Sequence, residues 1–489
     1  MTKLSVWRTA GAVFVLYAAT ASAARAQVFT TLADFKGEGS PEYMSLVQGR
    51  DANLYGTAVY GGNSLLGGTL FKITTRGLLS ELYSFCDDEV GCAGGAEPFG
   101  GLIQATNGNF YGTTATGGVP ASGTIFKITP AGTLTTLYTF CSSYPCTDGA
   151  YPYGTLIQAA DGNFYGTTYS GGTSTNCSGF GCGTVFKINP SGSLTTLHNF
   201  TLTDGASPYA GLIEAVGGDF YGTTYSGGAN GQGSVFKITR LGTLTTVYSF
   251  CALANCADGQ GPTAGLSQGI DGNFYGTTVF GGASGDGTVF KITPRGRLST
   301  LHSFDGTDSS GPTAGLVQGN DGYLYGTTFA AYVAGDGYGT IFKISTEGDL
   351  TMLYRFCSQP NCSDGAYPVG GLVQATNGIF YGTTTGYGAP DCVDSGFGFC
   401  GTVFSLDMSL GPFVAFVRGY GRVGRTIGIL GQGFTGATSV LLNGTPANFT
   451  VVSDTLIRAT VPAGATTGYV TVTTPSGTLK SNVPFHVIP

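Results

Sequence analysis

The sequence predicts an all-β protein with two parts, a seven-bladed β-propeller followed by a small β-sandwich. The motif Tyr-Gly-Thr occurs seven times at intervals of 50 to 56 residues, with its tyrosines at positions 55, 111, 165, 221, 275, 325 and 381. Four-stranded units repeated at this period are typical of propellers. After Gly411 the period ends, and apolar segments at about ten-residue spacing are typical of a sandwich. We expect the propeller over residues 27–408 and the sandwich over 409–489.

Each repeat reads as four strands separated by turn signals. In residues 156–200 the first strand begins at Leu156, and an Asp161-Gly162 turn leads to Phe-Tyr-Gly-Thr-Thr. A loop through Gly171-Gly172 precedes Thr-Val-Phe-Lys-Ile, and Pro190-x-Gly192 precedes Leu-Thr-Thr-Leu. Asp-Gly and Pro-x-Gly are turn formers between β-strands.

The two ends of the repeat region are complementary. Val28 to Phe35 matches a fourth strand without the first three, and the last repeat, from Leu372 to Phe404, lacks its fourth strand. We therefore predict that the early segment pairs with the seventh blade and closes the ring, which removes the free sheet edges of an open array.

The N-terminus reads as a secretory signal peptide over residues 1–26. Lys3 and Arg8 precede an apolar run from Ala10 to Ala19, and small-residue triplets follow. The run is shorter than a membrane span, and none is expected in the remainder. We expect an exported protein located outside the cell, at the cell surface or in the periplasm.

The chain is weakly charged and acidic. Its formal net charge is −7, with 21 basic and 28 acidic residues, and charged residues make up 10%. An acidic chain without a basic stripe argues against nucleic acid as a partner.

The 12 cysteines group into six pairs, each within one loop. Loops contain both members of a pair or neither, which indicates disulfides, and an oxidising compartment agrees. The predicted bonds are Cys86–Cys92, Cys141–Cys146, Cys177–Cys182, Cys251–Cys256, Cys357–Cys362 and Cys392–Cys400. A zinc site needs four ligands. Because the chain has only three histidines, two of them in strands away from these loops, we expect no metal.

Strand direction sorts the loops onto two faces. The first-to-second and third-to-fourth turns share a regular face, and we call it the turn face. The second-to-third and blade-to-blade loops share the other end, where the copies differ, and we call it the variable face. Binding usually resides on such loops, and aromatic rings with few charges suit sugars or peptides. The candidate ligand-binding aromatics are Tyr169, Tyr225, Phe280, Tyr332 and Tyr387, with packing between blades as the alternative role.

Acidic residues recur eight positions before the first-strand leucines, at Asp148, Asp204, Asp258, Asp308 and Asp364. If the first strand is innermost, these carboxylates would rim the mouth of the central channel and could bind a ligand or act as the acid and base of a glycosidase. The alternative is a turn in which each side chain bonds its own backbone.

Other recurring polar residues have structural alternatives. His198 and His302 occupy a position that is tyrosine in other copies, so they read as packing residues. One third-strand lysine and one first-strand glutamine recur in nearly every copy, with Glu214 replacing the glutamine in copy four, and we expect each to serve its own blade. We predict no catalytic residue and no cofactor, because phosphate-loop and dinucleotide motifs are missing.

Two named families share these motifs. The C-terminal part contains four short motifs in sequence order, namely Gly-Gln-Gly-Phe434, Asn443-Gly444, Val-Ser-Asp-Thr-Leu-Ile457 and Val461-Pro-Ala-Gly-Ala. In these motifs and their order it resembles the IPT/TIG family. The resemblance implies an immunoglobulin-like sandwich. The strings Phe-Tyr-Gly-Thr-Thr, Gly-Gly and Gly-Thr-Val-Phe-Lys-Ile resemble the GloVer tandem repeats of exported bacterial proteins, which implies export and repetition without a mechanism.

The sequence favours a non-catalytic exported propeller that binds a carbohydrate or a protein on the variable face. Two alternatives remain open. One is an extracellular glycan hydrolase or lyase that uses the acidic residues above, and the other is a structural cell-surface protein.

Overall fold

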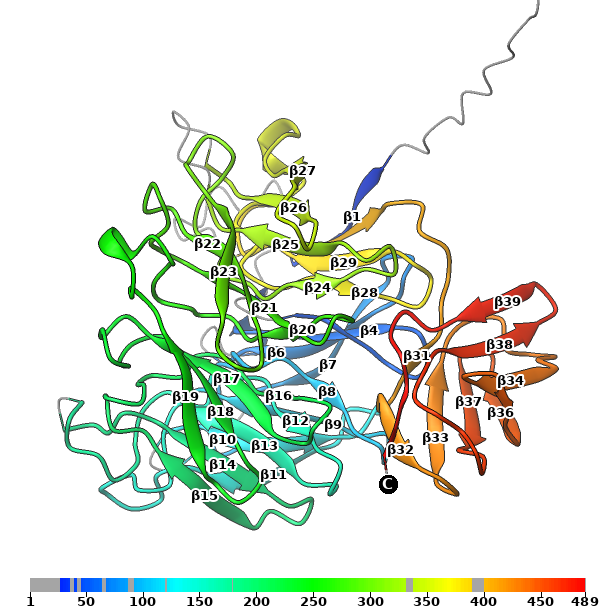
Figure 1. Cartoon of the computed structure of the whole chain (residues 1–489), viewed down its shortest axis with the longest axis horizontal. Coiled ribbons are helices and arrows are strands. Elements are labelled where there is room, and N and C mark those ends of the chain that lie inside the picture. Colours follow the sequence, from blue (N-terminus) through cyan, green and yellow to red (C-terminus); the bar gives the residue numbers. More distant parts are fainter. Residues whose placement is uncertain are drawn as a thin grey trace, which may run out of the picture.

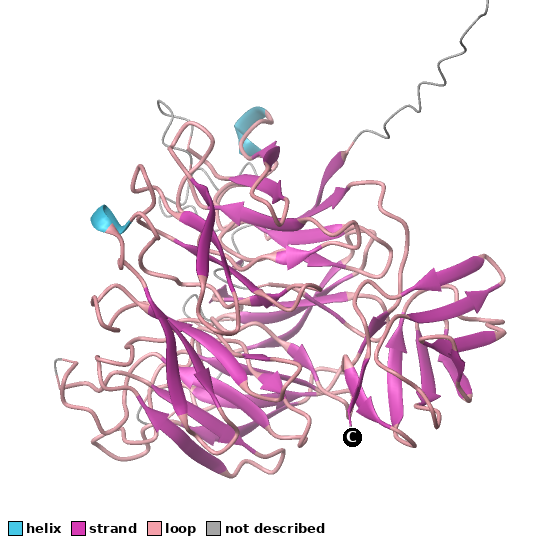
Figure 2. Ribbon diagram, viewed as in Figure 1, coloured by secondary structure: helices cyan, strands magenta, loops and turns pink. Residues whose placement is uncertain are grey.

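The computed structural model of the chain describes residues 27–35, 39–41, 45–63, 67–86, 92–118, 121–177, 179–330, 337–388 and 400–488. Apart from two 3-10 helices, η1 (Ala254–Cys256) and η2 (Pro360–Cys362), the described residues form strands and the turns between them (Figure 2). The all-β prediction is confirmed. The predicted signal segment, residues 1–26, lies outside the described residues.

Seven four-stranded antiparallel sheets form the propeller blades (Figure 1). Blades one to three are β3 (Val47–Gln48), β4 (Leu54–Ala58), β6 (Thr69–Ile73), β7 (Leu79–Ser84); β8 (Ile103–Gln104), β9 (Phe110–Thr114), β10 (Thr124–Ile128), β11 (Leu134–Thr139); and β12 (Ile157–Gln158), β13 (Phe164–Thr168), β14 (Thr184–Ile188), β15 (Leu194–Asn199). Blades four to six are β16 (Ile213–Glu214), β17 (Phe220–Thr224), β18 (Ser234–Ile238), β19 (Leu244–Ser249); β20 (Ser267–Gln268), β21 (Phe274–Thr278), β22 (Thr288–Ile292), β23 (Leu298–Ser303); and β24 (Val317–Gln318), β25 (Leu324–Thr328), β26 (Thr340–Ile344), β27 (Leu350–Arg355). A small separate sheet pairs β2 (Gly39–Ser40) with β5 (Tyr60–Gly61).

The seventh blade joins both ends of the repeat region. It contains β28 (Val373–Gln374), β29 (Phe380–Thr383), β30 (Thr402–Asp407) and, as its outer strand, β1 (Val28–Asp34). β1 pairs antiparallel with β30, with Val28 opposite Asp407 and Asp34 opposite Thr402. The predicted closure of the ring is confirmed.

The glycine of each Tyr-Gly-Thr strand is required by close packing between strands. At Gly166 an added Cβ would lie 2.6 Å from Phe186 Cζ and 2.9 Å from Leu156 Cδ2. Phe186 lies on β14 and Leu156 directly precedes β12, so both neighbours fill the space that a side chain on β13 would take. The same contacts recur at the equivalent glycines of the other blades.

A polar anchor ties the first-to-second turn of a blade to its second and third strands. In blade five the hydroxyl of Tyr275 donates to Asp271 Oδ2 at 2.8 Å, and Lys291 Nζ lies 2.9 Å from the same oxygen. Ion pairs Lys72–Asp51 and Lys237–Asp219 place the lysine in the same way. For these three lysines, the hypothesis that each serves its own blade is confirmed.

We expect this anchor to make stability depend on acid pH. Burial raises the pKa of Asp271, but hydrogen bonds from Lys291, Asn273 and Tyr275 outweigh it and lower the pKa to about 2. Because the folded pKa lies below the unfolded value of about 3.9, the carboxylate stabilises the fold above roughly pH 4 and ceases to do so as pH falls through 2. Asp271→Asn should lower the free energy of unfolding by about 1 kcal/mol at pH 7, a figure reduced for the partial exposure of the pair.

Urea unfolding at pH 7 and at pH 2 would measure this difference. The two proteins should differ at pH 7 and converge at pH 2. Glu347→Gln, which removes an exposed carboxylate from a turn of blade six, is the control and should change stability little at either pH. A deficit of Asp271→Asn that is equal at both pH values would contradict the assignment.

Five of the six first-strand glutamines link neighbouring blades. Gln104 Oε1 accepts from the backbone N–H of Arg50 in blade one at 2.9 Å, and its amide donates to Gly108 O of its own turn. Gln48 accepts from Thr376 N, which carries the pattern across the closure from blade seven to blade one. The expectation that each glutamine serves only its own blade is therefore wrong, because a side chain on an inner strand reaches the adjacent turn.

The C-terminal part is a two-sheet sandwich. One sheet has the order β31 (Ala415–Phe416), β33 (Thr426–Leu430), β37 (Leu456–Thr460), β36 (Phe449–Ser453), and the other β35 (Thr445–Pro446), β34 (Ser439–Leu442), β38 (Val470–Thr474), β39 (Gly477–Lys480). β32 (Tyr420–Arg422) pairs in parallel with β40 (His486–Ile488). Alternate residues such as Ile429, Val440 and Val472 point into a shared apolar core.

The sandwich contacts the turn face of the propeller (Figure 1). Arg418 donates to Ala159 O at 3.0 Å, and Tyr420 donates to Glu214 Oε2 at 2.6 Å. On another blade, Asn320 donates to Gly411 O at 3.0 Å. The variable face is therefore the face that these contacts leave uncovered.

Among the described residues, no helix is long and apolar enough to cross a bilayer.

Candidate functional site

The channel mouth on the variable face contains a cavity of about 380 Å³. Its walls are the residues that directly precede the first strands, and all seven blades contribute. The first strands are therefore innermost, and the segments leading into them converge on the propeller axis. A cavity on the axis of a rigid ring is the usual place for a small-molecule site.

The residues three positions before the first-strand leucines make this cavity asymmetric. Blades two, three and four place Phe99, Tyr153 and Tyr209 in the wall, whereas blades five and six place Thr263 and Thr313 there. The Thr263 hydroxyl donates to Thr313 O at 3.1 Å. The Thr313 hydroxyl is buried and has no hydrogen-bond partner among the described residues. One side of the mouth is thus aromatic, and the other is formed by two threonines.

The aromatic side is a packed cluster. Tyr153 and Tyr209 stack with centroids 4.9 Å apart, and Phe99 meets Tyr153 edge to face at 5.2 Å. Tyr169 packs against both tyrosines at 5.4 and 5.5 Å, and Tyr225 lies 6.5 Å from Tyr209. We call these five residues the mouth cluster. Burial raises the pKa of Tyr153 to about 12, so its phenol stays protonated in mildly alkaline solution as well as at neutral pH and can donate a hydrogen bond.

The predicted aromatic site residues are only partly brought together. Tyr169 and Tyr225 belong to the mouth cluster, where they pack on the wall tyrosines without lining the cavity themselves. Tyr387 lies in a second aromatic group. Its ring centroid is 5.7 Å from that of Tyr338 and 6.4 Å from that of Tyr367. Phe280 is exposed at 46% and does not line the cavity. Tyr332 lies outside the described residues.

The predicted carboxylates do not rim the channel, and this placement is wrong. Asp148 accepts from the Tyr138 hydroxyl at 2.8 Å and from Cys141 N, and Tyr138 lies on β11, the outermost strand of its blade. Asp258 and Asp364 make the same bond to Tyr248 and Tyr354 on outer strands and are fully buried. None of the five lines the mouth cavity.

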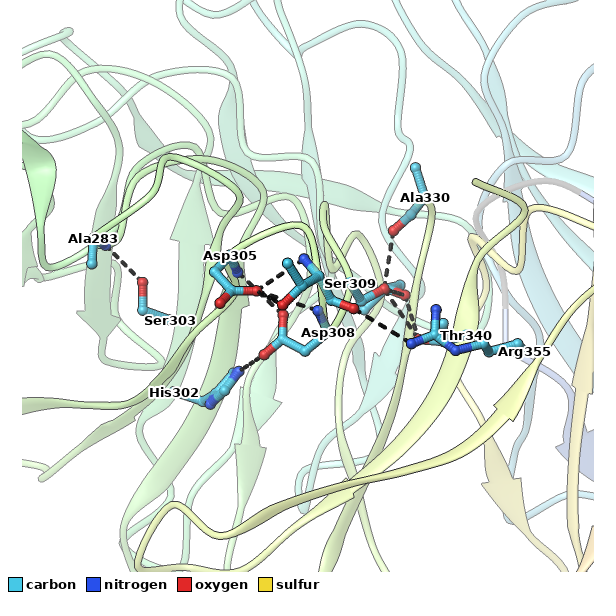
Figure 3. A network of polar contacts seen from close by, with 11 residues as sticks. Ala283, His302, Ser303, Asp305, Asp308, Ser309, Ala330, Thr340 and Arg355 are labelled. Atoms are coloured by element: carbon cyan, nitrogen blue, oxygen red, sulfur yellow. Dashed lines mark hydrogen bonds and ion pairs between the residues drawn. The ribbon is translucent and has the colours of Figure 1, made fainter. Parts of the chain in front are cut away.

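In blades three and five a histidine replaces the tyrosine. His198 Nε2 lies 2.9 Å from Asp204, and His302 Nε2 lies 2.6 Å from Asp308 (Figure 3). Burial raises the pKa of Asp204, but hydrogen bonds from His198 and Thr201 outweigh it, so the pKa lies below its ordinary value. Thr201 N and Asp305 N also donate to these carboxylates. All five carboxylates therefore fasten the loop that leaves the outer strand, as in the alternative turn interpretation.

Five predicted disulfides are present, Cys86–Cys92, Cys141–Cys146, Cys177–Cys182, Cys251–Cys256 and Cys357–Cys362. Cys400 is also disulfide-bonded, and its predicted partner Cys392 lies outside the described residues. Disulfides of this number are typical of an oxidising compartment. The described residues contain no group of three or more His, Cys, Asp or Glu side chains placed to hold a metal ion.

None of the wall residues Phe99, Tyr153, Tyr209, Thr263 and Thr313 is among the candidate ligand-binding residues that the sequence predicts. A usable signal was present, since each stands three positions before a first-strand leucine. That these positions share one cavity becomes evident only in the structure, where the ring of blades places them around one axis.

Fold and site together define the protein as a closed seven-bladed propeller that carries a β-sandwich on its turn face. The chain belongs to the Gloeobacter/Verrucomicrobia repeat family, whose model matches residues 7–180, 141–337 and 251–427. The IPT/TIG domain model matches residues 416–487. Both resemblances inferred from the motifs are confirmed.

Solved structures share the fold at low identity. A fungal alcohol oxidase of the AA5 family, in complex with copper, is 13% identical, with 94% of this chain and 99% of that chain covered and a TM-score of 0.53. A periplasmic gluconolactonase of Pseudomonas aeruginosa is 14% identical over 64% of this chain and 84% of that chain, with a TM-score of 0.42. A protein of Bacteroides uniformis provisionally named a 6-phosphogluconolactonase is 18% identical over 68% and 89%, with a TM-score of 0.45. These likenesses concern the fold alone. No curated protein matches the chain.

Proposed function

We propose that the protein is an exported, non-catalytic binding protein whose mouth cavity takes a carbohydrate. The observation that carries the proposal is the asymmetry of the cavity, with Phe99, Tyr153 and Tyr209 on one side and Thr263 and Thr313 on the other. A sugar ring has an apolar face that packs on aromatic rings and hydroxyls that need polar partners. The cavity volume of about 380 Å³ suits one or two sugar units at the end of a chain.

Export is part of the same proposal. The disulfides support an oxidising compartment, and residues 1–26 have the composition of a secretory signal. A glycan outside the cytoplasm would be accessible to such a protein.

The hydrolase or lyase alternative has less support. Cleavage of a glycosidic bond usually needs two carboxyl groups facing one substrate. The acidic residues considered for that role accept hydrogen bonds from tyrosine and histidine side chains on outer strands, away from the mouth cavity. A purely structural surface protein remains as an outcome of the test below.

Titration with a panel of neutral oligosaccharides tests the proposal. The wild-type protein should bind at least one member without converting it. Replacing Tyr153 and Tyr209 by alanine should weaken that binding about tenfold to a hundredfold, because each lost aromatic contact is worth about 0.5–1.5 kcal/mol. Binding would be followed by calorimetry and turnover by product analysis.

Phe280→Ala is the matched control, since Phe280 is an exposed ring outside the mouth cavity. It should leave affinity unchanged. Turnover that Asp204→Asn or Asp258→Asn abolishes would favour the hydrolase or lyase instead. Absence of both binding and turnover would favour the structural role and overturn the proposal.

A further inference from the structure

A second cavity lies between the propeller and the sandwich, on the turn face. It has a volume of about 930 Å³ and is lined by Arg50, Arg240, Arg418, Arg422, Arg425 and Arg458. Two of these belong to propeller turns and four to the sandwich. They are six of the 12 arginines in a chain whose formal net charge is −7. Asp161 is the acidic residue in the lining.

Most of this positive charge has no anionic partner. Arg240 forms an ion pair with Glu214, and it is the only cavity arginine with an ion pair among the described residues. Arg418 and Arg50 donate to the backbone carbonyls of Ala159 and Ala105, each at 3.0 Å, and a carbonyl neutralises no charge. The guanidinium group stays protonated at all ordinary pH values. The cavity therefore holds several uncompensated positive charges.

Arg50 shows the effect of this grouping. Burial and the nearby charge of Arg458 lower the pKa of Arg50, so its protonated form is less strongly favoured there than in water, although it remains the form present. The Nε atoms of Arg50 and Arg240 are buried and have no hydrogen-bond partner among the described residues. Positive charges that outnumber their counter-charges in this way are typical of a site that is completed by an anion.

We propose that this inter-domain cavity binds a multivalent oxyanion. Planar guanidinium groups match carboxylate and phosphoryl oxygens through paired hydrogen bonds, so either chemistry fits the lining. The volume admits a group as large as a tricarboxylate or a phosphorylated sugar. The first strands separate this cavity from the aromatic mouth, so the proposal does not depend on carbohydrate binding there.

Binding would join the two parts of the chain, because arginines from both line the same cavity. An anion that binds only the docked arrangement stabilises it in proportion to its concentration relative to its Kd. We therefore expect the ligand to raise the temperature at which the full chain unfolds.

Calorimetric titration of the full chain with citrate and with pyrophosphate, at constant ionic strength, tests the proposal. At least one should bind to a single site and raise the unfolding temperature. Preference for pyrophosphate would assign phosphoryl chemistry, and preference for citrate would assign carboxylate chemistry. Either preference supports the site, whereas binding of neither probe overturns it.

Two matched variants separate a site from general charge attraction. Arg422→Gln with Arg458→Gln removes two exposed cavity arginines and should weaken binding at least tenfold. Arg295→Gln with Arg297→Gln removes the same charge from an exposed turn of blade five and should leave affinity unchanged. Equal losses in both variants would overturn the proposal. Circular dichroism of each variant checks that it remains folded.

Discussion

Replacing Phe29 by alanine should destabilise the propeller by about 3 kcal/mol, although Phe29 lies on the outer strand of a blade. Its ring stacks on Tyr354 of blade six at 3.7 Å and packs against Phe404 of blade seven at 5.4 Å. It also meets Phe356 edge to face at 5.7 Å. The side chain therefore holds the closing strand, its own blade and the preceding blade together.

Equilibrium urea unfolding measures the loss. Thr30→Ala, at an exposed position of the same strand, is the control and should change the free energy of unfolding by less than about 0.5 kcal/mol. Limited proteolysis should cut Phe29→Ala first near its N-terminus, because β1 is the element released. Equal stability of the two variants would contradict a role of this ring in closure.

Glu214 and Tyr420 should be energetically coupled by about 1.5 kcal/mol, since a hydrogen bond to an ionised group is worth roughly 1.5–3 kcal/mol. Glu214 is the one departure from the glutamine of the other six copies. Its carboxylate accepts from Tyr420 at 2.6 Å and pairs with Arg240. It therefore replaces a contact between blades by a contact with the sandwich.

A double-mutant cycle with Glu214→Gln and Tyr420→Phe measures this coupling in the free energy of unfolding. Each single change should destabilise, and the double variant should lose less than the sum. Tyr469→Phe, elsewhere on the sandwich, is the control and should be additive with Glu214→Gln to within about 0.5 kcal/mol. Additivity of Glu214→Gln with Tyr420→Phe would show that the bond contributes nothing to docking.

The candidate site illustrates where sequence reasoning stops. The fixed offset of the acidic residues from the first-strand leucines predicts that their carboxylates lie at the channel mouth. That offset measures distance along a loop that runs from the outer strand of one blade to the inner strand of the next. Asp148 stands midway along the loop, which there approaches Tyr138 on the outer strand, whereas Tyr153 stands near the end of the loop, on the axis. Radial position depends on the course of the loop, which spacing alone does not give.

The arginine cavity could not be predicted from the sequence either, because its residues come from two domains. Arg50 and Arg458 are separated by about 400 positions in the sequence and belong to different folds, yet the charge of one lowers the pKa of the other. Arg418, Arg422 and Arg425 form a visible cluster in the sequence, but nothing local indicates that two propeller turns contribute to the same cavity.

The sequence by itself determined the seven units, their turns, the missing strand that closes the ring, the disulfide pairs and the two families. These follow from local chemistry, since Asp-Gly turns, strand alternation and paired cysteines act between residues close in the chain. Only the tertiary structure decided which side chains share the mouth, where the carboxylates lie and what the sandwich covers. Those depend on how seven blades and a second domain meet in space, and contacts between elements distant in sequence fix that arrangement.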